Sequence, residues 1–469
     1  MQQLKPLTLR RNFSWTFTGN LVYAASQWGM LVVLAKLGSP EMVGQFTLGL
    51  AVTAPVIMFT NLQLRSIQVT DAKGEYVFAD YLGLRLIGTG LALLIIAGIT
   101  LKAGYSWETS LVILAIGLAK AFESISDIFY GLIQQHERMD KIAIALMIKG
   151  PLSLLLLVIG VSVTGSVVGG AIGLAIAWAV VLIACDIRNG RLIVKSSQKA
   201  QRENLVETRA IATQVGEPAE STENPTHLPL LTPASQGGEK SKHQLLPRWH
   251  LKTLRKLIWL ALPLGFVMML ISLNSNIPRY FIEQYLGEQQ LGIFGAISYL
   301  MVVGGMVVSA LAESASPRLA KYYAAGNSIA FRTLMFKLVG VGAAIGGAGV
   351  LVAVVAGQEI LTILYRPEYG QQADLFVWLM VAAGIGYVSS FLGYGITAAR
   401  YFRIQMPLFA LVTGSSAIAC LWLIPSMGVQ GAAIALILGA IVQAVFSLGV
   451  IFHALYRLNK YQGTKSNID

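Results

Sequence analysis

The stretch Leu91-Ala-Leu-Leu-Ile-Ile-Ala-Gly-Ile99 is apolar at every position. A strand of a membrane barrel would alternate apolar and polar residues, so this run indicates a membrane helix instead. The whole chain has the same character: 55% of its 469 residues are apolar, and only 12% are charged. Soluble proteins carry about 25% charged residues, so the composition excludes a soluble enzyme and a disordered scaffold. The sequence therefore predicts an all-α polytopic membrane protein.

Twelve apolar runs have the length that a spanning helix needs, which is about 20 residues, and they fall into two sets of six. The first set lies near residues 13–36, 43–63, 80–101, 109–132, 142–163 and 166–187. The second lies near residues 256–277, 290–312, 333–355, 374–398, 405–425 and 428–453. We predict an N-terminal six-helix bundle (1–187), a linker (188–253) and a C-terminal six-helix bundle (254–469).

The predicted linker is polar and includes Glu217-Pro-Ala-Glu-Ser-Thr-Glu-Asn-Pro225. Its low apolar content cannot offset the entropy lost on ordering, so we expect a flexible cytoplasmic segment. It is either a plain tether between the two bundles or a regulatory segment that docks a partner.

Basic residues define the expected orientation in the membrane. With the N-terminus inside, the connections on that side carry Arg65, Lys73, Arg138, Lys141, Arg318, Lys321, Arg332, Lys337, Arg400 and Arg403, and the linker and tail add more. The other side receives only Lys36, Lys102, Arg279 and Arg366. The positive-inside rule then puts both termini in the cytoplasm. Because the net charge of +12 is scattered between apolar runs, it indicates membrane orientation and no nucleic-acid partner.

The sequence contains no pattern that predicts an enzyme, a metal site or a cofactor. Cys185 and Cys420 both lie in apolar runs, which argues against a disulfide framework. The histidines show neither metal-ligand nor catalytic-triad spacing; they are His136, His227, His243, His250 and His453.

An internal repeat relates the two halves. The segment Leu37-Gly-Ser-Pro-Glu-Met-Val-Gly-Gln-Phe46 is similar to Leu286-Gly-Glu-Gln-Gln-Leu-Gly-Ile-Phe294, which aligns Gly44 with Gly292. Val168-Gly-Gly-Ala-Ile-Gly-Leu174 is similar to Gln430-Gly-Ala-Ala-Ile-Ala-Leu436, in the same order. Halves with an even number of spans share one orientation, so we expect a pseudo-twofold axis along the membrane normal and a substrate site between the bundles.

Three motifs resemble one transporter family. They are the Leu-Gly-x-x-x-x-x-Gly-x-Phe turn at 37–46, Asp80-Tyr-Leu-Gly-Leu-Arg85, and Gly428-Val-Gln-Gly-Ala-Ala433. Their order resembles the oligosaccharide and polysaccharide flippases of the multidrug, oligosaccharidyl-lipid and polysaccharide exporter superfamily. The resemblance implies two bundles around a central cavity and a monomer in the bacterial inner membrane. It also implies flipping of undecaprenyl-(pyro)phosphate-linked oligosaccharide, with polysaccharide polymerase machinery as a possible partner.

Charged residues inside the first set of spans are candidate site residues, because each costs at least about 2.5 kcal/mol to insert. Lys120, Glu123 and Asp127 follow the spacing i, i+3, i+7 and share one helical face. Lys120, Lys149 and Arg85 on a cavity wall would bind a lipid phosphate. Alternatively, Glu123 or Asp127 binds a coupling proton or sodium ion. In a purely structural interpretation, Lys120 pairs with Glu123 and Arg85 reaches the cytoplasmic surface.

The second half offers fewer candidates. Asn274 and Asn276 are suited to hydrogen-bonding sugar hydroxyls and Arg279 to binding an anion, although all three could instead join helices together. Arg65 and Glu313 occupy equivalent repeat positions, and we expect them to meet as a cytoplasmic gate when the cavity opens outward.

Two other functions compete with flipping. A multidrug antiporter of the same superfamily is the nearer one, but the first span, 13–36, lacks the acidic residue common in such antiporters. An integral-membrane glycan polymerase or ligase would need a large periplasmic loop, whereas the long loop here is cytoplasmic by charge.

Overall fold

The computed structural model describes residues 8–71, 74–196 and 245–465 of the chain. All regular secondary structure in these ranges is helical, which confirms the predicted fold class. Most of the predicted linker, 188–253, lies outside the described residues, so its predicted flexibility is not tested.

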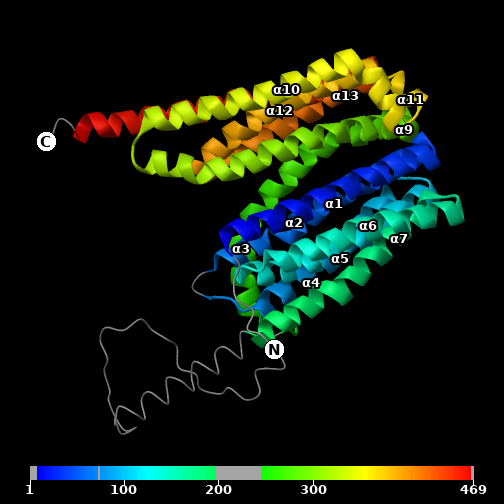
Figure 1. Ribbon diagram of the computed structural model, residues 1–469, viewed down its shortest axis with the longest axis horizontal. Coiled ribbons are helices and arrows are strands. Elements are labelled where there is room, and N and C mark those ends of the chain that lie inside the picture. The colour runs from blue at the N-terminus through cyan, green and yellow to red at the C-terminus, as the bar shows by residue number, and fades with distance from the viewer. Residues whose placement is uncertain (1–7, 72–73, 197–244, 466–469) are drawn as a thin grey trace, which may run out of the picture.

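The N-terminal lobe, defined here as residues 9–196, contains the helices drawn from blue to green in Figure 1. Its elements are α1 (Leu9–Leu37), α2 (Pro40–Asn61), α3 (Leu64–Thr70), α4 (Phe78–Lys102), α5 (Trp107–Gln135), α6 (Met139–Thr164), α7 (Val167–Val181) and the π-helical η1 (Leu182–Asp186). The helix that starts with α7 continues through η1 to residue 196.

The C-terminal lobe, residues 251–465, contains fewer but longer helices. They are α9 (Leu251–Ala324), α10 (Ser328–Leu364), α11 (Pro367–Gly370), α12 (Ala373–Ala398), η2 (Phe402–Ile404) and α13 (Gln405–Lys465). The backbone leaves helical geometry at Gly287 (φ +82°) in α9 and at Gly428 (φ +61°) in α13. Positive φ favours glycine, and each glycine divides its helix into two segments at the boundary that the sequence predicts.

Eight helices of the described residues are long and apolar enough to cross a membrane. The protein is therefore a multi-pass membrane protein, as predicted, while the number of twelve spans stays a prediction. Many side chains on these helices are large, apolar and exposed, including Leu94, Val163 and Trp422. Such an apolar surface is suited to contact with lipid.

The two lobes meet at one end and diverge toward the other (Figure 1). We call the meeting point the closed end; it contains Pro40 and Gly44 of α2 and Glu288 and Gly292 of α9. A Cβ atom on Gly44 would overlap the carbonyl oxygen of Glu288, and one on Gly292 would overlap that of Pro40. Since residues 40 and 44 align with 288 and 292, this contact is reciprocal, as expected for two repeats crossing at a pseudo-twofold axis.

Polar contacts also join the lobes at the closed end. The Thr109 hydroxyl donates to the Glu288 carboxylate. The Arg366 guanidinium donates to the Lys36 carbonyl at 2.7 Å, and the Trp28 indole donates to the Tyr365 hydroxyl at 3.3 Å. We call the opposite end, which carries Arg65 and Glu313, the open end.

The first segment of α9 crosses between the lobes. Near its start, the Arg248 amide donates to the Ala79 carbonyl at 2.9 Å, and Leu254 and Leu257 pack in a core with residues of α3, α4 and α5. Farther along, the rings of Phe59 and Phe266 lie 5.0 Å apart. The start of this segment therefore packs against the N-terminal lobe, and farther along the Thr413 hydroxyl of α13 donates to the Leu270 carbonyl at 3.2 Å. The segment thus lies between the two lobes.

Candidate functional site

A cavity of about 430 Å³ lies on the side of the N-terminal lobe that faces α9. Helices α1, α2, α5 and α6 contribute most of its wall, and Met268 of α9 closes one side. Its charged and polar lining residues are Thr16, Asn20, Tyr23, Asn61, Gln63, Arg65, Lys120, Glu123, Ser124, Asp127 and Tyr130.

The α5 face predicted from helical spacing points into this cavity, because Lys120, Glu123 and Asp127 all line it. Glu123 is the centre of a first charge cluster. Its carboxylate lies 2.8 Å from Lys120 Nζ and 3.5 Å from Lys149 Nζ, and it accepts a hydrogen bond of 2.8 Å from the Tyr23 hydroxyl. The predicted Lys120–Glu123 pair is thus present, and a second lysine joins it.

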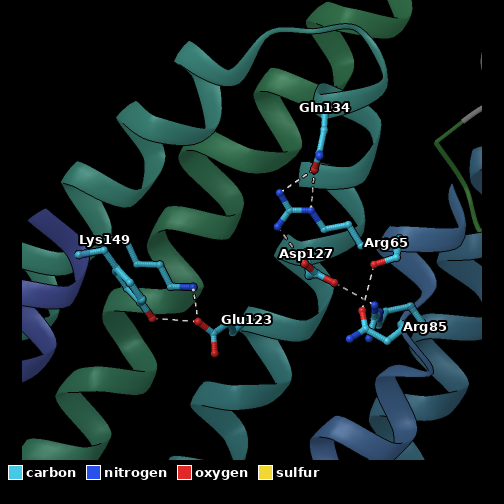
Figure 2. Close-up of polar contacts among 9 residues, drawn as sticks. Arg65, Arg85, Glu123, Asp127, Gln134 and Lys149 are labelled. Atoms are coloured by element: carbon cyan, nitrogen blue, oxygen red, sulfur yellow. Dashed lines mark hydrogen bonds and ion pairs between the residues drawn. The ribbon is translucent and has the colours of Figure 1, made fainter. Parts of the chain in front are cut away.

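Asp127 is the centre of a second cluster, shown beside the first in Figure 2. Its carboxylate lies 3.2 Å from Arg65 Nη1 and 3.0 Å from Arg85 Nη2. Arg65 also donates to the Gln134 side-chain oxygen at 2.9 and 3.1 Å. Each cluster therefore shares one carboxylate between two cations, which leaves both with an excess of positive charge.

Three of the four predicted anion ligands do not line the cavity, namely Arg85, Lys149 and Arg279, and neither do the predicted sugar ligands Asn274 and Asn276. The side chain of Arg85 is 0% exposed and that of Lys149 is 1% exposed, whereas Lys120 is 24% exposed. The placement of Arg85 and Lys149 on the cavity wall is corrected accordingly. The alternative in which Arg85 extends to the surface is also wrong, because its guanidinium is buried against Asp127.

Lys149 and Lys120 share an aromatic neighbour. The Lys149 ammonium lies 4.2 Å from the centre of the Trp178 ring, and the Lys120 ammonium lies 4.9 Å from it. An aromatic face stabilises a desolvated cation, which helps to explain how Lys149 stays buried. Trp178 itself donates to the Ser153 hydroxyl at 2.8 Å.

The C-terminal lobe contributes Arg279, whose environment differs from that of the other cations. Its guanidinium donates to the Asn276 side-chain oxygen at 2.9 Å, and its Nε has no hydrogen-bond partner. Within the described part of the chain, no carboxylate forms an ion pair with Arg279. Asn276 is thus engaged by Arg279, and its amide donates to the Ser272 carbonyl at 2.8 Å.

Arg279 and Asn274 both belong to the first segment of α9, and neither lines the cavity. Tyr299 is an electrostatic neighbour of Arg279 and also of Tyr23, the residue that hydrogen-bonds Glu123. Asn274 is placed differently: its side-chain oxygen lies near Gly439 of α13. The structure therefore places neither Arg279 nor Asn274 on the cavity wall in this conformation.

The predicted gate residues lie on different lobes and form no ion pair with each other in this conformation. Arg65 is bound to Asp127 and Gln134, and Glu313 is exposed on the second segment of α9. Since the prediction concerns the state in which the open end has closed, it stays a prediction.

Sequence reasoning missed Asp186. It is completely buried at the end of the π-helical η1, behind the cavity wall. The signal was available, since a carboxylate next to Cys185 in the apolar run at 166–187 is unusual, but its position beside the expected linker suggested a span end.

Comparison with solved structures shows which class of protein has this fold. The chain is similar, at a TM-score of 0.64 and 11% identity, to an inward-facing multidrug resistance MATE family transporter of the MOP superfamily, over 94% of this chain and 95% of that one. It is similar at a TM-score of 0.63 and 11% identity to the lipid II flippase MurJ in an inward closed conformation, over 96% and 92%. The fold is that of this transporter superfamily.

Sequence comparison narrows the relationship. Residues 9–210 match the family described as polysaccharide biosynthesis protein. Over 440 residues the chain is 26% identical to the capsular polysaccharide biosynthesis protein CapF of Staphylococcus aureus, covering 93% of this chain and 97% of that protein. These findings confirm the predicted resemblance to the polysaccharide members of the exporter superfamily.

Proposed function

We propose that the protein is a flippase that moves undecaprenyl-(pyro)phosphate-linked oligosaccharide across the bacterial inner membrane for polysaccharide synthesis. The substrate crosses chemically unchanged, so the function requires neither a catalytic residue nor a cofactor. The similarity to CapF supports the link to polysaccharide, and the fold shared with MurJ supports the type of movement. As further parts of the proposal, the protein acts as a monomer and delivers its product to polymerase machinery.

The observation that carries the proposal is the excess of cations inside the membrane. Four cations share the carboxylates of Glu123 and Asp127, and Arg279 has no ion-pair partner among the described residues. A cation withdrawn from water without a counter-charge is costly, and a phosphate or pyrophosphate headgroup would neutralise it. A lysine such as Lys120 is suited to releasing that anion again, because it acts as a single point charge without fixed bidentate geometry.

The positive-inside rule orients the proposed transport cycle. It puts both termini and the open end on the cytoplasmic side, so this conformation would receive substrate from the cytoplasmic leaflet. Opening of the glycine crossing at Gly44 and Gly292, with closure near Arg65 and Glu313, would then release it on the other side. Binding energy alone cannot drive net transport, so direction must come from an ion gradient, the membrane potential or product removal.

A multidrug antiporter is the alternative, because the fold is shared with MATE family transporters. The cationic cavity favours an anionic cargo over the cationic compounds that an antiporter would take up against a proton or sodium gradient. The two functions make opposite predictions in cells.

Deletion of the gene in its native host tests the proposal. We expect lipid-linked glycan to accumulate in the cytoplasmic leaflet and the surface polysaccharide to disappear, with unchanged sensitivity to cationic drugs. Normal polysaccharide together with increased drug sensitivity would support the antiporter.

Complementation of the deletion with Lys120→Gln tests the cavity itself, with Lys337→Gln on the exposed face of α10 as the control. Equal activity of the two variants would show that Lys120 is not part of the site.

A further inference from the structure

Asp186 occupies an unusual position in the N-terminal lobe. It ends the π-helical turn η1, and its side chain is 0% exposed. Single π-helical turns inside α-helices are rare and occur frequently at functional sites. Helices α5, α6 and α7 pack against this turn, so Asp186 lies inside the lobe and not toward lipid.

The groups that face Asp186 come from two neighbouring helices and from its own. Ser126 and Tyr130 of α5 and Lys149 of α6 interact with the carboxylate. Cys185 and Arg188 flank it along its own chain.

The oxygen atoms in this cluster lie close together but form no hydrogen bond of good geometry. Both carboxylate oxygens of Asp186, the Ser126 hydroxyl and the Tyr130 hydroxyl are buried without a hydrogen bond of acceptable geometry. No ion pair of Asp186 falls within 4.0 Å among the residues that the structure describes. Burying an ionised carboxylate without such partners is very unfavourable, whereas a protonated carboxyl is neutral and can donate to either hydroxyl.

The other two membrane carboxylates on this side are already neutralised. Glu123 has ion-pair partners in Lys120 and Lys149, and Asp127 has partners in Arg65 and Arg85. Taking up a proton at either site would break two ion pairs and leave buried cations unmatched. The chemistry of proton uptake therefore favours Asp186 over the two carboxylates that the sequence suggested for coupling.

A metal cation fits the Asp186 site poorly. The Lys149 ammonium faces the same carboxylate and would repel a metal ion. No group of three potential metal-ligating His, Cys, Asp or Glu residues occurs anywhere in the described ranges.

We propose that Asp186, flanked by Ser126, Tyr130 and Lys149, is the site that binds and releases the proton coupled to transport. This inference rests on the proposed flipping function. With a proton bound, Asp186 is neutral and Lys149 pairs with Glu123 alone. After the proton returns to water, the Asp186 carboxylate competes for Lys149, so Glu123 holds Lys120 more tightly. When Asp186 is protonated again, Lys149 neutralises Glu123, and Lys120 in the cavity is free to bind an anionic headgroup.

Direct measurement of the proton tests the site without any substrate. Infrared difference spectra of the purified full-length protein, recorded across pH, should contain a carboxyl band that Asp186→Asn removes. Asp374→Asn, at an exposed position in the first turn of α12, should leave that band unchanged. Ser126→Ala and Tyr130→Phe should shift its frequency, which keeps the test valid if Asp186→Asn folds poorly. A band that persists in Asp186→Asn, or that neither hydroxyl substitution moves, would overturn the proposal.

Coupling itself is tested in proteoliposomes with a fluorescent undecaprenyl-diphosphate disaccharide as the probe. A proton gradient should accelerate flipping by the wild-type protein about tenfold, and Asp186→Asn should lose this response while its gradient-free exchange persists. A gradient response retained by Asp186→Asn, or a response to sodium and not to protons, would overturn the proposal. Wild-type protein without any exchange would instead refute the flippase function, and the infrared result would still assign or dismiss the proton site.

Discussion

The two lobes are built from related sequences but use them differently. Where they cross, they are symmetric: Gly44 packs on the backbone of Glu288, and its repeat equivalent Gly292 packs on the backbone of Pro40. In their charged residues they are asymmetric: the N-terminal lobe contains two carboxylates with paired cations, while the C-terminal lobe contributes Arg279, which donates to an amide and has no ion pair among the described residues.

This difference separates two requirements of a transporter. Rocking two bundles about a common axis needs matching surfaces, so both repeats retain a glycine where backbones touch. Binding a cargo needs a particular arrangement of charge, which one lobe can provide without the other. Substitutions of the charged residues should therefore have different effects in the two lobes, on stability or on transport. The equivalent glycine substitutions at the crossing should have the same effect in both lobes.

The largest expected effect is on stability, from Asp127→Asn. It would leave the fully buried Arg85 guanidinium without a counter-charge, and breaking a buried pair in this way costs about 3–5 kcal/mol. The free energy of unfolding of the purified protein in detergent measures this cost. The double variant Arg85→Met/Asp127→Asn should recover most of the loss, because an apolar replacement removes the unmatched charge. A single variant as stable as the exposed control Asp374→Asn would contradict the assigned cluster.

The second-largest expected effect is on substrate affinity, which Arg279→Gln should lower. A hydrogen bond to a charged group contributes about 1.5–3 kcal/mol, so binding of undecaprenyl diphosphate should fall roughly 10- to 150-fold. The folded fraction should change little, since Arg279 leaves no carboxylate unpaired. Titration of the purified protein with this lipid measures affinity, with Lys337→Gln as the control. Unchanged affinity in Arg279→Gln would show that the C-terminal lobe does not bind the headgroup.

The glycine crossing should respond symmetrically. Gly44→Ala and Gly292→Ala each introduce a methyl group against backbone, and overpacking of this kind costs about 1–3 kcal/mol. Both should shift the population toward the state with the open end closed. Spin labels at exposed Thr70 and Ser314 should report shorter distances for both variants and no change for Gly347→Ala, whose added Cβ would meet open space. A shift in one variant only would argue against a pseudo-twofold crossing.

The smallest expected effect concerns the predicted gate. Ion pairs at exposed sites contribute about 0.2–1 kcal/mol, so Glu313→Arg should lower the rate of flipping by up to about fivefold. Arg65→Glu also removes the ion pair with Asp127, so it should lower the rate further. Combining the two reversals should restore part of the lost rate if the residues meet in the outward-open state. Additive losses of rate in the double variant would contradict the predicted gate. Flipping rates in proteoliposomes, measured for all three variants in parallel, decide between these outcomes.

Much of the fold followed from the sequence, because apolar run length and repeated motifs are local properties. The break at Gly287 falls within the predicted connection between residues 277 and 290, and the break at Gly428 falls at the first residue of the last predicted span. The shared face of Lys120, Glu123 and Asp127 followed from helical spacing. The crossing of the first α9 segment onto the N-terminal lobe was not predictable, since it depends on how the lobes pack.

The site was predicted less completely. Helical spacing shows which residues share a face of one helix, but not what a neighbouring helix places over that face. Arg85 and Lys149 are covered in this way, by Asp127 and by Trp178 respectively. Asp186 was missed for a related reason: its importance depends on a π-helical turn and on hydroxyls from α5, and neither is visible in its own stretch of sequence.

The most direct test of the account is flipping of a fluorescent undecaprenyl-diphosphate disaccharide by purified protein in liposomes, read from the fraction that a membrane-impermeant quencher can reach. We predict that the wild-type protein makes nearly all of the probe accessible. Arg279→Gln combined with Lys120→Gln should leave accessibility near that of protein-free liposomes, while Lys337→Gln should match the wild type. Equal accessibility with the wild-type protein and with protein-free liposomes would contradict the central claim that these lobes enclose a path for an anionic lipid headgroup.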